Sequence, residues 1–83
     1  MSNYAELVEF IAKSLVTKPE AVAVEETKDE ETGVVRVLVS VDAEDTGRII
    51  GKKGATINSI RHVAKAASVK AGERVDVDVK ESI

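Results

Sequence analysis

Two glycines that bracket two lysines form the part of the sequence best suited to a chemical task. The stretch reads Gly47-Arg48-Ile49-Ile50-Gly51-Lys52-Lys53-Gly54 and comes directly before a helical pattern. Glycine lets a backbone approach a ligand closely and adopt positive φ without strain. The lysines place cations at that approach, and the start of the next helix adds unpaired N–H groups and a partial positive charge. Together these features suit a phosphate, and a series of phosphates indicates a nucleic-acid strand.

The distribution of charge supports this interpretation, although the chain is acidic overall. The formal net charge is −3, from 12 Lys and Arg against 15 Asp and Glu. Six of the cations and none of the acids lie between positions 46 and 72, so this segment carries +6 and the remainder −9. A basic patch on an acidic body can bind a polyanion at one site and repel it elsewhere. The six cations are Arg48, Lys52, Lys53, Arg61, Lys65 and Lys70.

Composition limits the classes of protein that fit. The 83 residues, 43% of them hydrophobic, suffice for one domain that folds alone. With no cysteine and a single histidine, the sequence predicts no disulfide, no metal and no cofactor. The longest apolar run is Ala21 to Val24, so no membrane span is expected. The N-terminus has no basic or long apolar signal region, which favours a cytoplasmic protein.

Hydrophobic periodicity and turn residues predict six elements in the order α-β-β-α-α-β. The valines of the clearest strand alternate with other residues, and a charged turn that ends in Gly33 joins it to the preceding strand as an antiparallel hairpin. The expected class is α+β, with a three-stranded sheet and helices packed on one face. The elements are a helix from 4 to 17, strands at 21–27 and 34–41, a short helix at 43–49, a long helix at 55–70 and a strand at 74–80.

Polar residues at the expected helix ends act as caps. Asn3 and Glu6 resemble a capping box, and Asp42 is expected to cap the short helix with Asp45 at its third position. Gly72 stands where a C-cap glycine belongs.

The long helix carries two stripes at about 100° per residue. One stripe is apolar and is expected to pack on the sheet. The neighbouring stripe is polar and would continue the positive surface of the glycine loop along the helix. The apolar stripe is Ile57, Ile60, Ala64 and Ala67, and the polar stripe is Asn58, Arg61 and Lys65.

The string from Arg48 to Ile57 resembles the signature of the KH domain, an Ile/Val-Ile-Gly-x-x-Gly-x-x-Ile core. The matching residues are Ile49, Ile50, Gly51, Gly54 and Ile57. An extra helix and strand precede the core, which resembles the type II, bacterial arrangement, and the resemblance covers essentially the whole chain. Residues 1–83 are therefore expected to form a single type II KH domain with its GxxG loop at 51–54. A single domain of this length is similar to the small KhpA-type RNA-binding proteins of bacteria.

The resemblance implies that the 51–54 loop clamps the backbone of about four single-stranded nucleotides. Lys52 and Lys53 would then face phosphates, while Ile50 and Ile57 would line an apolar groove for bases, although apolar residues at helical spacing more often belong to a core. Val39 or Val41 is expected to form the other wall, and the sequence leaves open which. The candidate nucleic-acid-binding residues are Arg48, Ile50, Gly51, Lys52, Lys53, Gly54, Ile57, Asn58, Arg61 and Lys65, of which Arg48, Asn58, Arg61 and Lys65 rest on charge and helical spacing.

The resemblance also implies partners and a role. These are single-stranded RNA and either a homodimer or a heterodimer with a larger KhpB (Jag)-type RNA-binding protein, with no membrane association. RNA chaperoning and post-transcriptional control linked to cell-wall homeostasis and cell shape belong to the same implication. Tyr4 and Phe10 are the only aromatics and are expected to pack in the N-terminal helix, so binding by one copy is expected to be weak and weakly sequence-selective.

The sequence has three alternative interpretations of function. An enzyme is disfavoured because Gly47 and Gly51 are too close for a P-loop and Lys53 stands where its hydroxyl residue belongs. A KH fold used only for protein interaction is disfavoured because the loop keeps its glycines and cations. Single-stranded DNA remains open, since nothing in the sequence tests for the 2′-hydroxyl.

Overall fold

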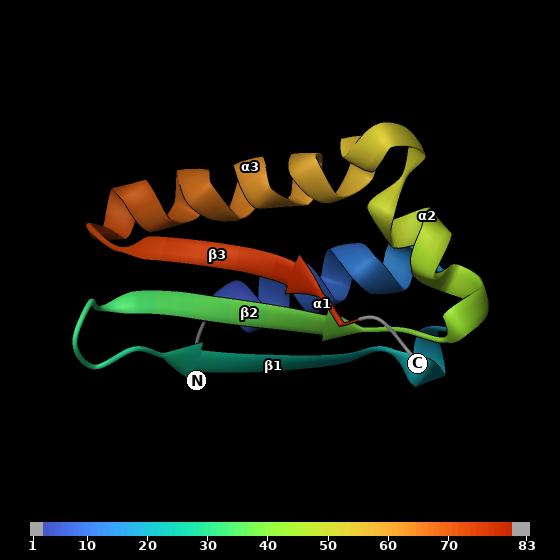
Figure 1. Cartoon of the computed structure of the whole chain (residues 1–83), viewed down its shortest axis with the longest axis horizontal. Coiled ribbons are helices and arrows are strands. Elements are labelled where there is room, and N and C mark those ends of the chain that lie inside the picture. The colour runs from blue at the N-terminus through green and yellow to red at the C-terminus, as the bar shows by residue number, and fades with distance from the viewer. Residues whose placement is uncertain (1–2, 81–83) are drawn as a thin grey trace.

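A computed structural model describes residues 3–80 of the chain, apart from the side chain of Asn3 (Figure 1). The expected order α-β-β-α-α-β is confirmed, with three short 3-10 turns (η) added between the main elements. The elements are α1 (Asn3–Leu15), η1 (Pro19–Ala21), β1 (Ala23–Lys28), β2 (Val34–Ser40), η2 (Ala43–Asp45), α2 (Thr46–Ile50), η3 (Lys52–Gly54), α3 (Ala55–Ala71) and β3 (Arg74–Val79).

The three strands form one sheet in the order β1-β2-β3. β1 and β2 form the predicted antiparallel hairpin, in which Val24 lies opposite Val39. β3 adds to the other side of β2 in parallel, with Val77 opposite Val37. A parallel neighbour requires a long crossover connection, and α2 and α3 supply it. β2 is therefore the central strand, and β3 is an edge strand next to α3.

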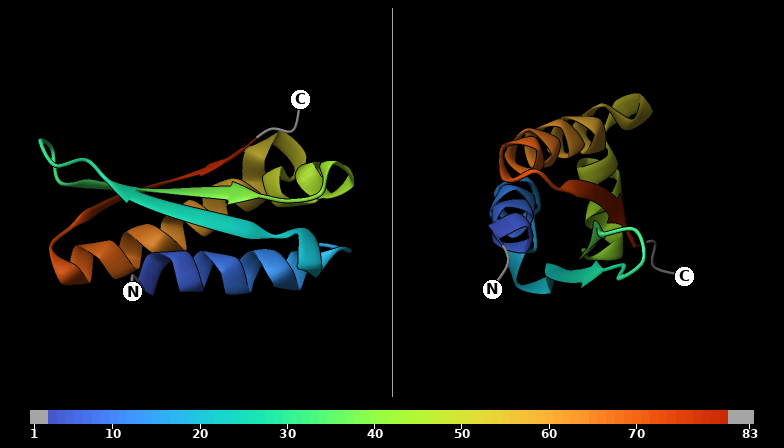
Figure 2. Two further views of the ribbon diagram at one scale, coloured as in Figure 1. Left: turned by 90° about the horizontal axis from the view of Figure 1, so that it is seen from below. Right: turned by 90° about the vertical axis from the view of Figure 1, so that its left-hand side faces the viewer.

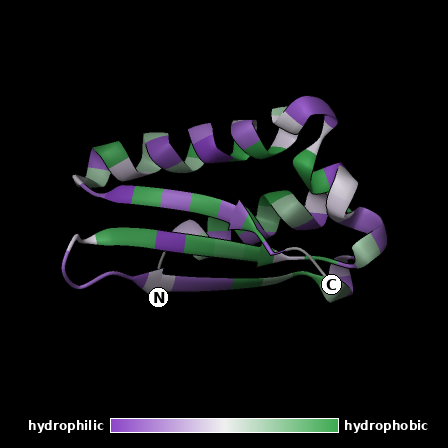
Figure 3. Cartoon of the chain, viewed as in Figure 1, coloured by the Kyte–Doolittle hydropathy of each residue, from purple (hydrophilic) through white to green (hydrophobic). Residues whose placement is uncertain are grey.

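Both long helices cover one face of the sheet and leave the other face open to solvent (Figure 2). The alternation predicted for the central strand is confirmed, because Val35, Val37 and Val39 are buried whereas Arg36 is exposed. Figure 3 shows the same alternation as green and purple bands along the strands, and hydrophilic colour at the turn between α2 and α3. The buried hydrophobic residues are Tyr4, Val8, Ala12, Val35, Val37, Val39, Val41, Ile49, Ile57, Ile60, Ala64 and Val77.

Three predicted boundaries were wrong. The first helix ends at Leu15 rather than near position 17. The first strand begins at Ala23 rather than at position 21, because the residues from Pro19 form a 3-10 turn closed by Ala21 N–H donating to the Lys18 carbonyl. The short helix begins as a 3-10 turn and becomes α-helical only at Thr46. Proline fixes φ near the helical value, which explains why a tight turn and not an extended strand follows it.

The caps at Asp42 and Gly72 are confirmed. The Asp42 carboxylate accepts a hydrogen bond from Glu44 N–H at 3.0 Å, and Gly72 adopts the left-handed conformation that ends α3. Asp45 does not act as the expected helper at a third helical position, because its carboxylate is turned toward the end of α1. The Asn3 half of the predicted capping box lies outside the described residues.

Two predictions about packing were also wrong. Ala67 is exposed, and the buried stripe of α3 ends instead at Ser68, which lies four residues after Ala64. The Ser68 hydroxyl is satisfied because it donates to the Lys65 carbonyl at 2.8 Å. Phe10 does not pack in the core and is 72% exposed on α1. Within residues 3–80, no helix is long and apolar enough to cross a bilayer.

Candidate nucleic-acid interface

Gly51, the first glycine of the loop, occupies a backbone conformation that side chains cannot share. Its φ of 77° and ψ of 172° lie in a region that is essentially restricted to glycine. A Cβ atom built there would lie 2.7 Å from both the Thr56 Cβ and the Thr56 backbone nitrogen. The glycine therefore lets the chain turn sharply from α2 into η3 while it packs against the first turn of α3.

The two lysines of the loop point into solvent with their hydrogen-bonding groups unused. Lys52 and Lys53 are exposed, and no hydrogen bond or ion pair joins either ammonium group to another residue of the described chain. In the same part of the chain, neither backbone N–H donates to a turn or cap acceptor. Lys53 is in addition left-handed, with φ 57° and ψ 28°, which is uncommon for a residue with a side chain. Strained positions of this kind cluster at ligand-binding sites.

The N-terminus of α3 adds a helix dipole to the loop. Gly54 adopts the left-handed conformation, and α3 runs 17 residues from Ala55 with no side chain capping its first turn. The unpaired N–H groups of such a terminus carry about half a positive charge and bind anions. Loop and helix start therefore present backbone donors and two lysines to the same region of space.

Arg48 lies on α2, one turn before the loop, and is partly engaged by a buried acid. Its Nε is 3.7 Å from Oδ1 of Asp45, yet its side chain is 60% exposed. Asp45 is fully buried, and the hydrogen bond from the Thr17 backbone is the main cause that lowers the pKa of its carboxyl. The negative charge of Asp45 therefore stays in place and holds Arg48 beside the loop while leaving much of the guanidinium accessible.

Three of the four aliphatic residues considered for a groove beside the loop are buried. Ile57 is only 5% exposed and belongs to the core, while Ile50 is half-buried and packs against that core. Val39 is fully buried and Val41 is 7% exposed, so neither can form a wall against which a base would lie. Of the four predicted aliphatic residues, Ile50 keeps the most accessible surface.

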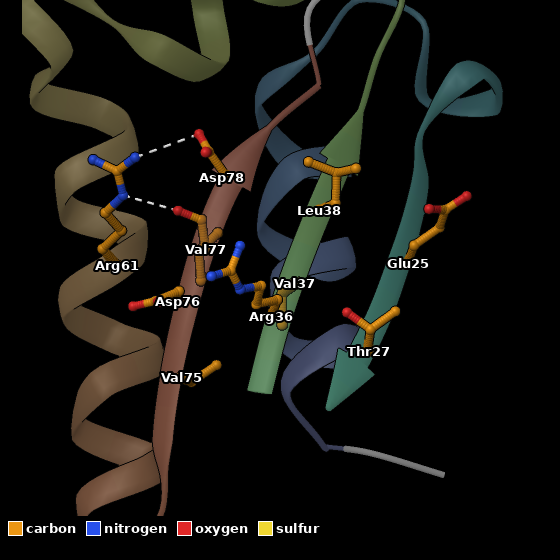
Figure 4. Close-up of a pocket in the computed structure, with 10 residues that line it drawn as sticks. All are labelled: Glu25, Thr27, Arg36, Val37, Leu38, Arg61, Val75, Asp76, Val77 and Asp78. Atoms are coloured by element: carbon orange, nitrogen blue, oxygen red, sulfur yellow. Dashed lines mark hydrogen bonds and ion pairs between the residues drawn. The ribbon is translucent and has the colours of Figure 1, made fainter. Parts of the chain in front are cut away.

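The polar stripe of α3 does not form the continuous cationic track that helical spacing suggested. Arg61 reaches across to the edge of β3, where its Nε donates to the Val77 carbonyl at 2.9 Å and its Nη2 lies 3.6 Å from Oδ1 of Asp78 (Figure 4). Its Nη1 also donates to the Asn58 side chain at 3.0 Å. Lys65 is exposed further along the helix. Arg61 is thus held by Asn58 and by the edge of β3, although 45% of its side chain stays exposed.

Sequence analysis missed the charged residues that face Arg61. Asp76 and Asp78 alternate with valines along β3 and lie on the open face of the sheet. Arg36 lies on β2 opposite Asp76 in the parallel register. The signal that could have found this cluster is the alternation of acids on the last strand against an arginine on the central strand.

Comparison with known proteins matches this arrangement to one family. The family model described as KhpA/KhpB, KH domain, matches residues 5–79. The chain belongs to this family. The proteins named RNA-binding protein KhpA from Clostridium perfringens and Clostridium acetobutylicum are 49% and 43% identical to it over 74 residues. In each case the match covers 89% of this chain and 96% of the relative.

Solved structures of Era contain a similar fold. A crystal structure of Aquifex aeolicus Era bound to GDP and AlF4− has a TM-score of 0.63 and 24% identity, and covers 92% of this chain but only 29% of Era. A structure of Era in complex with MgGDPNP and nucleotides 1506–1542 of 16S ribosomal RNA has the same TM-score, with 26% identity and coverage of 92% and 28%. The KhpA/KhpB chain therefore spans less than a third of the Era chains that it resembles.

Proposed function

We propose that the chain binds single-stranded RNA through the 51–54 loop and acts as one type II KH domain. The observation that carries this proposal is the loop itself, in which two solvent-facing lysines, whose backbone N–H groups make no turn or cap hydrogen bond, stand at the start of a 17-residue helix. An acceptor-rich phosphate fits this set of donors, since it satisfies both the cations and the backbone groups. The relatives named RNA-binding protein KhpA and the Era complex with ribosomal RNA support the choice of ligand.

The proposed contacts divide by position. Gly51 and Gly54 shape the loop, Lys52 and Lys53 pair with successive phosphates, and Ile50 offers the small apolar surface beside them. Arg48 and Lys65 add positive charge on either side of the loop. Ile57, Asn58 and Arg61 support this surface from the core and from the edge of β3.

One copy is expected to bind weakly, with an affinity that falls as salt rises. Aromatic stacking contributes about 1–3 kcal/mol per base in many single-strand binders. In the described chain, Tyr4 is buried and Phe10 lies on α1, so neither aromatic belongs to the loop or to α3. Binding would rest on phosphate contacts, for which the logarithm of affinity falls by about 0.7 per contact for each tenfold rise in salt.

The test is a titration of labelled single-stranded RNA and DNA of equal sequence at two salt concentrations. The Lys52→Asp/Lys53→Asp variant should lose most of the affinity, while the matched Lys13→Asp/Lys28→Asp variant carries the same change of charge on α1 and β1 and should keep most of it. Equal binding by wild type and the loop variant would refute the proposed role of the loop. Tighter binding of DNA than of RNA would favour the alternative ligand.

We further propose that the chain pairs with a second copy or with a larger KhpB (Jag)-type protein, because one family model describes the KH domains of both KhpA and KhpB. Pairing would raise the affinity of two weak sites by effective concentration. Light scattering of the purified chain, alone and mixed with a KhpB-type protein, tests the two assemblies. A monomer in both samples would refute pairing and leave a single-site RNA binder. We propose separately that the protein is cytoplasmic and has no catalytic activity.

The proposed biological role is that of an RNA chaperone or post-transcriptional regulator. A protein-interaction module is the alternative, and it predicts a folded protein that binds no nucleic acid in the titration above. An unwinding or annealing assay with structured RNA would test the chaperone role. The unwinding or annealing activity should be lost in the Lys52→Asp/Lys53→Asp variant if the chaperone role uses the proposed loop.

A further inference from the structure

A hollow of about 550 Å³ lies on the open face of the sheet, beside α3, and has no part in the phosphate contacts proposed above (Figure 4). Its volume falls in the range of about 300–1,000 Å³ typical of small-molecule sites. Arg61 forms one wall, and the half-buried Leu38 supplies apolar surface. We propose that this hollow receives a guanine base of the bound strand, read by Arg61 and Asp78. The proposal rests on the RNA binding inferred above.

The charges of the hollow exclude a phosphate and admit a neutral polar ring. Three carboxylates line it (Glu25, Asp76 and Asp78) against two guanidinium groups (Arg36 and Arg61), so its formal charge is −1. A phosphate would be repelled there, whereas a flat base offers donors to the acids and acceptors to the arginines. The side chain of Leu38 suits the face of such a ring.

The position of Arg61 connects the hollow to the loop. Arg61 follows Ala55, the first residue of α3, by six residues, which corresponds to about 9 Å along the helix axis. A loop of this kind clamps about four nucleotides, so neighbouring bases of the same strand can reach that far. Because the loop is cationic and β3 carries Asp76 and Asp78, the phosphates would lie toward the loop and the bases toward β3.

Guanine is the base whose hydrogen-bonding groups match this pair. Its N1–H and N2 amino group are adjacent donors that a carboxylate such as Asp78 can accept together, and its O6 accepts from Arg61. Uracil presents a ring N–H without an adjacent amino group, and cytosine and adenine each present an amino group without an adjacent ring N–H. Arginine has five N–H donors. The Val77 carbonyl and the Asn58 side chain each accept one of them, and the ion pair with Asp78 uses Nη2. Arg61 can therefore donate to a base without leaving the strand edge.

The experiment measures affinities for four eight-nucleotide RNAs, octauridine and octauridine with one central guanosine, adenosine or cytidine. Wild type should bind the guanosine probe about tenfold more tightly than octauridine, as expected for one well-formed bidentate base contact. Asp78→Asn should reduce that ratio to below about twofold, because an amide presents a donor to one of the guanine N–H groups. Asp76→Asn is the matched control, since it removes the same charge from the same strand and should keep the ratio.

Removing a carboxylate is expected to raise the affinity for any RNA, because it removes a negative charge. The ratio of the affinities for the guanosine probe and octauridine cancels this general gain and reports base recognition alone. Arg61→Lys keeps the positive charge without the planar fork and should lower the guanosine ratio. In NMR spectra, the Arg61 Nε–H resonance should move more with the guanosine probe than with octauridine. An unchanged guanosine ratio in folded Asp78→Asn, or equal affinity of wild type for all four probes, would overturn this inference alone. A folded wild type that binds none of the probes would instead refute the proposed function.

Discussion

Thr17 donates both its backbone N–H and its hydroxyl to one carboxylate oxygen of Asp45, at 3.0 and 2.8 Å. The second oxygen of Asp45 accepts from Lys18 N–H at 3.1 Å. A buried carboxylate with this many donors is well compensated for its loss of hydration. The residues that follow α1 are thereby tied to Asp45, which directly precedes α2. The helix that leads into the 51–54 loop is therefore held by these hydrogen bonds as well as by the packing of Ile49 in the core.

We expect acid to remove the contribution of Asp45 to stability. Hydrogen bonds from Thr17 lower the folded-state pKa of this carboxyl, so the stabilisation is present above its unfolded pKa and is lost as pH falls through the folded value. In Asp45→Asn the amide brings N–H groups toward backbone donors, and the melting temperature should fall by several degrees at neutral pH. Thermal melts across the acid range should show wild type and variant converging as pH drops. A deficit of equal size at every pH would contradict this account.

The hydrogen bond between Tyr4 and Glu73 gives a second pH-dependent prediction. The Tyr4 hydroxyl donates to Glu73 Oε1 at 2.6 Å, and this bond is the main cause that raises the pKa of Tyr4 to about 12. Since the protonated phenol is favoured by folding, its stabilisation is present below the unfolded pKa of about 10 and is lost as pH rises through the folded value.

Glu73→Gln should lower the Tyr4 pKa toward its ordinary value. The chain has a single tyrosine and no tryptophan, so ultraviolet absorbance follows the phenolate directly. Glu26 also acts to raise the pKa of Tyr4, but as a smaller cause than Glu73. Glu26→Gln is therefore the matched control and should move the titration less. A wild-type titration midpoint near 10 would show that the bond does not form in solution.

Sequence periodicity was sufficient to predict the sheet and the helices but not the polar contacts between them. Val35, Val37 and Val39 repeat with the period of a half-buried strand, and that pattern depends only on which face meets the core. Asp45 was expected at the third position of a helix capped by Asp42 because it lies three residues after that cap, whereas its actual partner Thr17 lies 28 residues away in sequence. Long-range side-chain contacts of this kind leave no local pattern.

The site shows the same division. The glycines and lysines of the loop were identified from their spacing and their resemblance to a known motif. Arg61 was expected to continue the positive surface of the loop along the helix, because helical spacing gives the direction of a side chain but not the neighbour it meets. The Val77 carbonyl that it contacts belongs to an edge strand, and which strand forms the edge follows from the sheet order rather than from the sequence.

The two glycines of the loop should differ in their tolerance of a side chain. At Gly51, alanine should cost about 1–3 kcal/mol in backbone strain and about 1–3 kcal/mol more from overlap with Thr56. At Gly54, the nearest atoms to an added Cβ are 3.8 and 3.9 Å away, so only the left-handed backbone opposes it, at about 1–2 kcal/mol. Urea denaturation of Gly51→Ala and Gly54→Ala measures the difference. A larger loss at Gly54 would mean that the loop conformation differs from the one described.

The loop lysines should contribute to the salt dependence of RNA binding in equal steps. Each phosphate neutralised on a single strand contributes about 0.7 to the slope of log affinity against log salt. Lys52→Ala and Lys53→Ala should therefore each reduce the slope by about 0.7, and the double variant by about 1.4. Fluorescence anisotropy over a salt series measures these slopes. Lys70→Ala, at the far end of α3, should leave the slope near its wild-type value.

The parallel pairing of β2 with β3 has a consequence for the kinetics of the fold. The β1–β2 hairpin closes a short turn, whereas β3 reaches β2 only after the whole crossover from 41 to 73 has been ordered. Contacts between distant parts of a chain form more slowly than local ones, so β3 is expected to dock after the hairpin. Elements that dock late and lie at an edge are candidates for transient opening in the native state. Amide hydrogens of β3 would then exchange with solvent sooner than those at the centre of β2, and a bound RNA strand would slow their exchange first.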